Sequence, residues 1–282
     1  MKKYIFFLLI IINSFLSAQV YSDNDVKICN DKFKFAVDKN LSSKPVNEVI
    51  TEIARSFIGT AYEASALEAD GEEQLVINLT GLDCTTFLEN ALVLARLVKQ
   101  DKTRFNDYQN ELTYIRYREG KIDQYPSRLH YFSDWIYDNI QKGVVKDVTK
   151  EIGGEKIKFN LNFMSTHPQS YKHLKENPSF VTVIKKQEEE INSRQYYYIP
   201  RNKVARLESK IQSGDLIAIT TSIKGLDIGH VGIAVKEKDG RIHLLHAPTV
   251  GSKVHITKEP LPDYLMNVKK HSGIIVLRAV EL

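Results

Sequence analysis

Three side chains that lie far apart in the sequence, Cys84, His230 and His246, form a set that could hydrolyse an amide. Asp83 is a good helix N-cap, and the apolar residues after it recur at helical spacing, so Cys84 is predicted in the first turn of a helix. The positive end of a helix lowers the pKa of a thiol, and the thiolate is the nucleophilic form. We therefore expect a reactive cysteine, which needs a histidine as base.

Strand periodicity selects two of the eight histidines as partners for this thiol. His230, in the segment GHVGIAV, shares a strand face with Gly232 and Ala234, and we expect these small residues to leave room for the end of a helix. His246 lies in the next predicted strand, on the face opposite that of His243. Since these two histidines diverge and no carboxylate joins them at ligand spacing, the pattern predicts no metal site.

The turn between the two strands decides whether His246 can reach His230. The DG dipeptide in this turn is typical of a two-residue hairpin turn, but that turn would place the two histidines on opposite faces. We therefore predict a three-residue loop, Lys238–Gly240, with Gly240 at positive φ and His246 opposite Gly232. In that register the two rings are diagonal neighbours on one face, within hydrogen-bonding distance.

The elements that must position these residues predict an α+β fold. Residues 43–58 and 84–99 have the apolar spacing of helices, with a long loop between them. The segment of about residues 100–178 is rich in tyrosine and charge, and we predict helical and turn structure inserted before a sheet. From about Ser179 the pattern changes to strands, in the segments FVTVI, QYYYIP, DLIAITT, HVGIAVKE, RIHLLHA and SGIIVLRAV. Helices that precede strands are typical of the α+β class.

The chain opens with two lysines, an apolar run and small residues ending at Ala18, which is the layout of a secretory signal peptide. The run is too short for a permanent membrane span, and no lipid-acceptor cysteine follows it. We therefore expect residues 1–18 to be removed, and an exported protein, periplasmic or secreted, without a membrane anchor. The apolar fraction of the chain, 43%, is that of a globular protein, and residues 19–282 are predicted to form one domain.

The charge and composition of the chain argue against several other classes of protein function. The formal net charge of +4 includes Lys2 and Lys3 of the predicted leader, and the remainder is too weak and dispersed to indicate nucleic-acid binding. No glycine-rich phosphate loop or repeat is present, so no cofactor is predicted. One alternative stays open for the two cysteines: Cys29 and Cys84 could form a disulfide in an oxidising compartment, which would remove the nucleophile.

The order of the segments DCTTF, GHVGIAV and LLHAPTVG resembles that of the NlpC-type superfamily of papain-like bacterial cell-wall hydrolases. FIGTAYEAS is similar to the Gly-Thr-Pro-Tyr segment of that superfamily, with Ala61 at the proline position and Tyr62 retained. Other segments, such as YPSRLHYFSDWI and NFMSTHP, resemble an exported N-acetylmuramoyl-L-alanine amidase-like branch. The resemblance implies a papain-like NlpC-type fold, in which the catalytic helix packs on an antiparallel sheet with helical and loop insertions.

The resemblance also implies roles for individual residues. Cys84 would be the nucleophile, His230 the general base and then the acid, and His246 the residue that orients the imidazole. Tyr62 and the backbone N–H of Cys84 would bind the oxyanion. The run KKQEEE, residues 185–190, is interpreted as a solvated turn or helix end without a function. Candidates for binding the carboxylates and sugar of a substrate, with packing as the alternative, are Arg128, His130, Tyr131, Thr166 and His167.

The resemblance implies a peptidoglycan fragment, a muropeptide, as the substrate, cleaved between the muramyl lactyl group and L-alanine. An alternative is an endopeptidase that cuts the stem peptide after D-glutamate, and the three catalytic residues cannot distinguish the two activities. A second alternative is a non-catalytic protein that binds cell-wall fragments. The complete set of cysteine and two histidines argues against that alternative.

Overall fold

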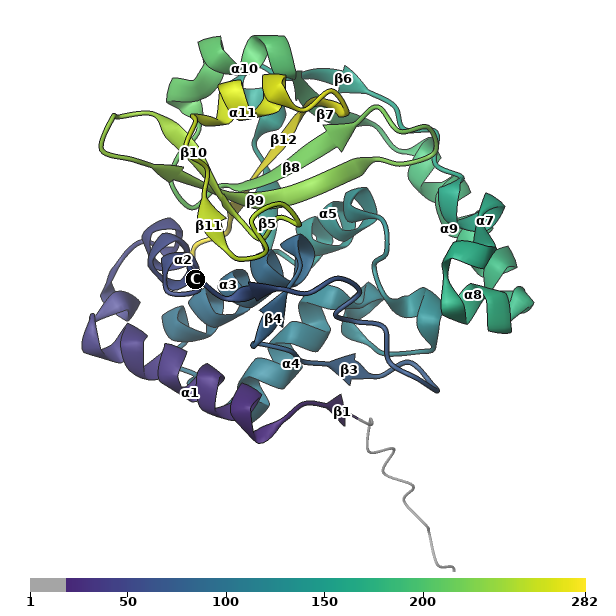
Figure 1. Ribbon diagram of the computed structural model, residues 1–282, viewed down its shortest axis with the longest axis horizontal. Coiled ribbons are helices and arrows are strands. Elements are labelled where there is room, and N and C mark those ends of the chain that lie inside the picture. The colour runs from purple at the N-terminus through teal and green to yellow at the C-terminus, as the bar shows by residue number, and fades with distance from the viewer. Residues whose placement is uncertain (1–18) are drawn as a thin grey trace, which may run out of the picture.

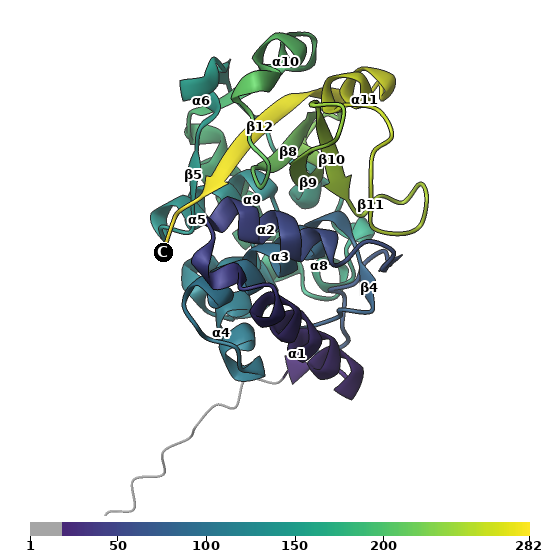
Figure 2. The same cartoon turned by 90° about the vertical axis from the view of Figure 1, so that its left-hand side faces the viewer.

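The computed structural model describes residues 19–282, in which a layer of helices packs against one face of an antiparallel sheet (Figure 1). Two further helices, α10 and α11, cover the other face of the sheet, as the side view in Figure 2 also shows. The predicted leader, residues 1–18, lies outside the described residues. Within residues 19–282, no helix has both the length and the apolar character that a membrane span requires.

The main sheet has the strand order β11-β10-β9-β8-β12-β7-β6, and β5 also pairs with β12. Every pairing in it is antiparallel, so the predicted α+β class with an antiparallel sheet is confirmed. Two small parallel pairs, β1 with β3 and β2 with β4, lie outside this sheet. The strands are β1 (Gln19–Val20), β2 (Ala61–Tyr62), β3 (Leu75–Val76), β4 (Gly81–Leu82), β5 (Val145–Asp147), β6 (Glu155–Ile157), β7 (Tyr196–Pro200), β8 (Leu216–Thr221), β9 (Ile228–Lys236), β10 (Ile242–His246), β11 (His255–Ile256) and β12 (His271–Ala279).

The helices come mainly from the first two thirds of the chain. The α-helices are α1 (Asp23–Asp38), α2 (Val46–Arg55), α3 (Cys84–Lys99), α4 (Phe105–Arg116), α5 (Phe132–Gln141), α6 (Thr149–Ile152), α7 (Phe163–Thr166), α8 (Lys172–Glu176), α9 (Pro178–Ser193), α10 (Arg201–Leu207) and α11 (Leu261–Asn267). Short 3-10 helices occur at Leu41–Ser43, Arg118–Gly120, Tyr125–Ser127, Pro168–Ser170 and Glu208–Lys210.

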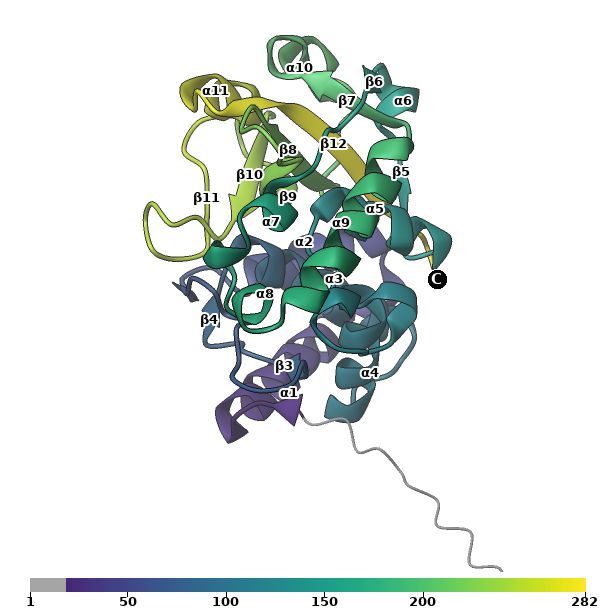
Figure 3. The same cartoon turned by 90° about the vertical axis from the view of Figure 1, so that its right-hand side faces the viewer.

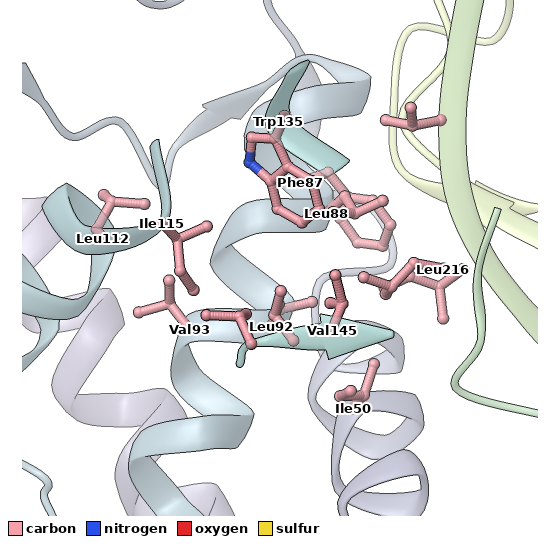
Figure 4. Packing of buried hydrophobic residues seen from close by; sticks show 14 of the residues in the cluster. Ile50, Phe87, Leu88, Leu92, Val93, Leu112, Ile115, Trp135, Val145 and Leu216 are labelled. Carbon is pink, nitrogen blue, oxygen red and sulfur yellow. The ribbon is translucent and has the colours of Figure 1, made fainter. Parts of the chain in front are cut away.

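Helix α3 is the centre of the helical layer, and its first residue is Cys84. Asp83 caps the helix as predicted: its carboxylate accepts from the backbone N–H of Thr86 at 2.7 Å, and the Thr86 hydroxyl oxygen accepts from the Asp83 N–H at 2.9 Å. The apolar side chains of α3 fill the main core, with Phe87 and Leu88 near Leu216 of the sheet (Figure 4). This packing fixes where the helix begins and hence where the thiol lies.

The central strands β8, β9, β10 and β12 divide their apolar residues between two cores. Val231 and Ile233 face the helical layer, whereas Ala234 lies in a second core with Leu261 and Leu265 of α11. His230 alternates with Val231, so it belongs to the α11 side of β9. Helix α3 packs on the other face of β9, so Gly232 and Ala234 do not make room for it as expected. Only the start of α3 reaches the strand, at Val231 next to His230.

The predicted strand FVTVI, residues 180–184, is instead part of helix α9, which runs beside α7 and α8 (Figure 3). Its β-branched residues favour a strand, but Pro178 in the first turn starts a helix. Ile184, Glu188 and Ile191 are buried at the helical spacing of four and three residues. The segment of residues 100–178 also differs from the expectation, because it contributes β5 and β6 to the main sheet.

A buried ion pair joins the helices of this layer. Glu89 of α3 and Arg116 of α4 are 1% and 3% exposed, and Nε of the arginine donates to Oε2 at 2.7 Å. Trp135 of α5 donates to the other carboxylate oxygen at 3.2 Å, and Arg116 also donates to the carbonyl of Val76 at 2.6 Å. Burial raises the pKa of Glu89, so the arginine is needed to keep its carboxylate charged.

We therefore expect Arg116→Met to lower the free energy of unfolding by about 3 kcal/mol or more, because it leaves a buried carboxylate without its partner. Urea unfolding followed by circular dichroism measures this loss. Lys34→Ala is the control, since Lys34 pairs with Asp38 on the exposed face of α1 and its removal should leave the midpoint unchanged. Equal effects of the two substitutions would contradict this account of the buried pair.

Candidate active site

Cys84 is a free, half-buried thiol at the start of α3. The backbone of Val231 and the side chain of Thr85 hydrogen-bond its sulfur, so the end of the helix meets β9 next to His230. Cys29 is also free and lies buried in α1. The disulfide alternative is therefore excluded, and the thiol is available for chemistry.

The hairpin between β9 and β10 has the predicted three-residue loop. Ile242 pairs with Lys236, and the N–H of Gly240 donates to the carbonyl of Glu237 at 2.9 Å. Gly240 has a φ of 78°, which a residue with a side chain adopts only at a cost. The same register continues along the strands and places His246 opposite the glycine two residues after His230, as predicted.

The register brings the two histidine rings into contact. Nε2 of His230 lies 2.8 Å from Nδ1 of His246, and the ring planes are inclined by 80°. Gly232 makes this approach possible, because a Cβ at that position would lie 2.9 Å from the carbonyl oxygen of Leu245. The small residue that the sequence places beside His230 therefore admits the neighbouring strand rather than a helix.

The second nitrogen of His246 determines how the pair shares its protons. Nε2 of His246 is buried without a hydrogen-bond partner among residues 19–282. The rings of Tyr264 and His255 lie nearly perpendicular to the imidazole, with centroids at 5.4 and 5.0 Å. An N–H can rest against an aromatic face, whereas a bare lone pair gains nothing there. We therefore assign the proton to Nε2, which leaves Nδ1 to accept from His230.

Burial governs the protonation of all three side chains. It lowers the pKa of His230 to about 4, with a further contribution from His271, and it lowers that of His246 to about 2. It also raises the pKa of Cys84 to about 11, and the carboxylate of Asp83 acts in the same direction. Desolvation thus opposes the thiolate that the end of the helix favours. These three shifts favour a thiol and neutral imidazoles in the resting site.

A pocket of about 280 Å³ contains both Cys84 and His230. Its wall is formed mostly by aromatic and apolar side chains from the segment before α5, from α7 and from the start of β9. One charged side chain lines it, that of Asp227, which is 2% exposed and accepts from the backbone N–H of Ser133 at 2.7 Å. Since no lysine or arginine is among these lining residues, the pocket suits an uncharged group.

Tyr62 and Arg128 are near the site but outside the pocket lining. Tyr62 pairs with Leu82, two residues before Cys84, so it lies beside the start of α3. Arg128 is 5% exposed, and its guanidinium donates to a Glu68 carboxylate oxygen at 2.8 Å and to the carbonyl of Leu67 at 2.9 Å. These contacts give Arg128 a packing role.

The other candidates for substrate binding divide into two groups. His130 and Tyr131 line the pocket beside the catalytic candidates. Thr166 and His167 are exposed at the end of α7, hydrogen-bonded to each other at 3.0 Å, and neither is part of the lining. Met164, two residues earlier, is the member of this segment that reaches the pocket.

Glu188 is a structural residue of the site that the sequence interpretation missed. It lies in the run read as a solvated turn, but it is 2% exposed in the middle of α9. Its Oε1 accepts from the Tyr131 hydroxyl at 2.7 Å and from the Ser165 N–H at 3.1 Å, and the Tyr131 oxygen accepts from the Met164 N–H at 3.0 Å. Glu188 therefore holds two walls of the pocket together. Its helical spacing to buried isoleucines was the available signal.

Among residues 19–282, no group of three or more histidine, cysteine, aspartate or glutamate side chains is placed to hold a metal ion. The two histidines of the site bond each other instead, and the thiol contacts β9.

Comparison with known proteins supports a hydrolase. The chain is similar to the crystal structure of an N-acetylmuramoyl-L-alanine amidase from Bacteroides uniformis, with 38% identity, a TM-score of 0.79, and coverage of 83% of this chain and 98% of the other. It is also similar to a Bacteroides fragilis structure named as a candidate xylanase, with 42% identity, a TM-score of 0.74, and coverage of 80% and 98%. No curated protein matches the chain.

These likenesses and the mixed α+β fold define the class as amidase-like peptidoglycan hydrolases. The chain belongs to the AmiA-like family, described as N-acetylmuramoyl-L-alanine amidase-like, whose model matches residues 52–274. A Legionella pneumophila protein with 21% identity and a TM-score of 0.68 shares the fold over 92% of this chain and 95% of its own.

The raised pKa of the thiol predicts how Cys84 reacts with iodoacetamide. Because only the thiolate reacts and its pKa is about 11, we expect the rate of alkylation to rise about tenfold per pH unit between pH 7 and 9. Intact-mass spectrometry of the Cys29→Ala variant follows the one remaining thiol. A rate that stays constant over this range would contradict a protonated thiol and indicate a thiolate–imidazolium pair at rest.

Proposed function

We propose that this protein hydrolyses the amide between the N-acetylmuramoyl lactyl group and L-alanine of peptidoglycan fragments, with Cys84 as the nucleophile. The observation that carries the proposal is the pocket in which Cys84 and His230 meet a wall without lysine or arginine. Membership of an amidase-like family and relatives named as amidases support the same substrate class.

In the proposed reaction, His230 takes the thiol proton as the sulfur of Cys84 attacks the lactyl carbonyl carbon. The carbonyl oxygen becomes an oxyanion, which the backbone N–H of Cys84 and the hydroxyl of Tyr62 would stabilise. The C–N bond then breaks, and His230 returns the proton to the nitrogen of L-alanine. A thioester remains on the sulfur. Water hydrolyses it after losing a proton to His230, which restores the thiol and frees the muramyl acid.

His246 contributes through orientation in this scheme. With the tautomers assigned above, it accepts from Nε2 of His230 at 2.8 Å, so the other nitrogen of the His230 ring keeps a lone pair that can take the thiol proton. The same hydrogen bond stabilises the imidazolium that forms during attack. Because His246 is neutral, it stabilises that cation less than a carboxylate would.

The pocket wall favours the amidase over the alternative endopeptidase. An enzyme that cuts after D-glutamate must accommodate a free carboxylate next to the scissile bond, and a buried carboxylate needs a cation. Arg128, which precedes the lining residue Leu129 in the sequence, is already engaged with Glu68. The muramyl side of the lactyl amide carries no charge at the reacting carbon and suits aromatic walls.

The same pocket gives less support to two other functions, glycoside hydrolysis and binding without catalysis. A glycosidase requires two carboxyl groups that face each other across the bond, and the lining supplies only Asp227, which is bonded to a backbone N–H. A protein that only binds fragments has no need of a thiol beside a hydrogen-bonded pair of histidines.

We also propose that the protein belongs to the papain-like NlpC-type superfamily, that residues 19–282 act as one domain, and that the chain is exported. The order of Cys84, His230 and His246 along the chain, and the contact of α3 with β9, support the first proposal. The leader-like composition of residues 1–18 supports export to the periplasm or beyond.

Incubation with a purified N-acetylmuramoyl peptide, followed by mass spectrometry, tests the proposed activity. We expect free N-acetylmuramic acid and a stem peptide that begins with L-alanine. Cys84→Ala and His230→Ala should each reduce the rate by at least about 10³-fold, whereas His246→Ala should retain roughly 100-fold more activity than either.

His243→Ala is the matched control for these variants. His243 points to the opposite face of β10 and bonds the carbonyl of Thr257 at 2.9 Å, so its loss should leave the rate nearly unchanged. Cleavage after D-glutamate would assign the endopeptidase activity instead. Full activity of His230→Ala would remove the proposed base.

A further inference from the structure

The pocket contains an imidazole that the proposed mechanism does not use. His130 precedes α5 and lines the pocket together with Cys84 and His230. Its Nε2 lies 2.9 Å from the carbonyl oxygen of Tyr125. A carbonyl oxygen only accepts, so Nε2 carries the proton and donates it to this bond.

This hydrogen bond fixes the other nitrogen of His130 as an acceptor. In residues 19–282, Nδ1 makes no hydrogen bond to the protein, and it is not one of the buried polar atoms that lack a partner. The atom therefore keeps an accessible lone pair on a ring that borders the pocket. The ring cannot easily turn, because it packs on Tyr125 with centroids 4.2 Å apart, and His173 stacks on the same tyrosine at 4.7 Å.

Burial and the neighbouring charges favour the neutral form of His130. Burial lowers its pKa well below the usual range, and the charge of Arg128 acts in the same direction, as do the smaller contributions of Arg118 and His173. The carbonyl of Tyr125 opposes them but is outweighed. Since the ring stays neutral at ordinary pH, Nδ1 remains an acceptor and does not become a donor.

Two other polar side chains of the wall, Tyr131 and Asp227, are already engaged in hydrogen bonds. The Tyr131 hydroxyl donates to Glu188 and accepts from the N–H of Met164. The carboxylate of Asp227 accepts from Ser133 at the start of α5. Nδ1 of His130 is thus an acceptor that the fold leaves available on a residue of the pocket that also contains Cys84.

We infer that His130 is a specificity-determining residue that accepts, through Nδ1, a hydrogen bond from a neutral donor of the substrate. The donor is an amide N–H or a hydroxyl of the muropeptide, so the inference rests on the proposed function. A carboxylate has no proton to give and would face the lone pair of Nδ1. Of the carboxylates and sugar that were expected as partners of the candidate residues, a sugar hydroxyl fits this polarity of His130, whereas a carboxylate does not.

The test combines two substitutions with substrate analogues. His130→Leu removes the acceptor, whereas His130→Gln keeps an N–H for the Tyr125 carbonyl and an amide oxygen for the substrate. The substrate is the N-acetylmuramoyl peptide already described. Three analogues each lack one kind of donor: an N-methylated acetamido group, O-methylated sugar hydroxyls, or an N-methylated amide between L-alanine and D-glutamate.

With the intact substrate, we expect His130→Leu to lower kcat/KM about tenfold, mainly through KM, and His130→Gln to stay within about threefold of the parent. For the parent protein, kcat/KM should be lower by a similar factor with the analogue that lacks the donor to His130. With that analogue as substrate, kcat/KM of His130→Leu should equal kcat/KM of the parent protein. The analogue that shows this pattern identifies the donor as acetamido, hydroxyl or stem amide.

Three results would overturn the inference. His130→Leu could hydrolyse the intact substrate as well as the parent, or it could lose the same factor with every analogue, which indicates a purely structural effect. The parent protein could also cleave all three analogues as fast as the intact substrate, a result that does not depend on any variant folding. Absence of cleavage of the intact substrate by the parent protein would instead reject the proposed function, and with it the donor named here.

Discussion

The hydrogen bond between Nε2 of His230 and Nδ1 of His246 is the interaction on which the site depends. It exists only in one register of the β9–β10 hairpin, and a shift of one residue would place the rings on opposite faces of the sheet. That register needs the left-handed Gly240 in the loop and the missing side chain of Gly232, where β10 comes close. Two glycines thus set the geometry of two histidines.

Burial of the three side chains determines which protonation states the site favours. The end of α3 favours a thiolate, but the half-buried sulfur of Cys84 and the neighbouring Asp83 favour the thiol, while burial keeps His230 and His246 neutral. These shifts favour a resting site without separated charges on the three side chains. In the proposed reaction, attack transfers a proton from sulfur to nitrogen within the pocket, and the helix end and His246 would stabilise the resulting pair.

The sequence predicts the site correctly where strand periodicity and the chemical requirement agree. Alternation along β9 and β10, together with the need for His246 to meet His230, predicts the hairpin loop correctly. Predictions from the sequence were wrong where two physical effects oppose each other. The β-branched residues 180–184 suggest a strand, but the helical spacing of the following residues and Pro178 determine α9. The burial of Glu188, like the desolvation of Cys84, depends on segments that only the folded chain brings together.

Long-range ¹H–¹⁵N NMR of the histidine rings in the folded protein tests the central claim most directly. If His246 orients His230 as described, both rings carry their proton on Nε2, Nδ1 of His246 has the shift of an unprotonated acceptor, and neither ring titrates between pH 5 and 8. His230→Ala and His246→Ala spectra assign the signals. A proton on Nδ1 of His246, or a titration of His230 near its ordinary pKa, would contradict the account.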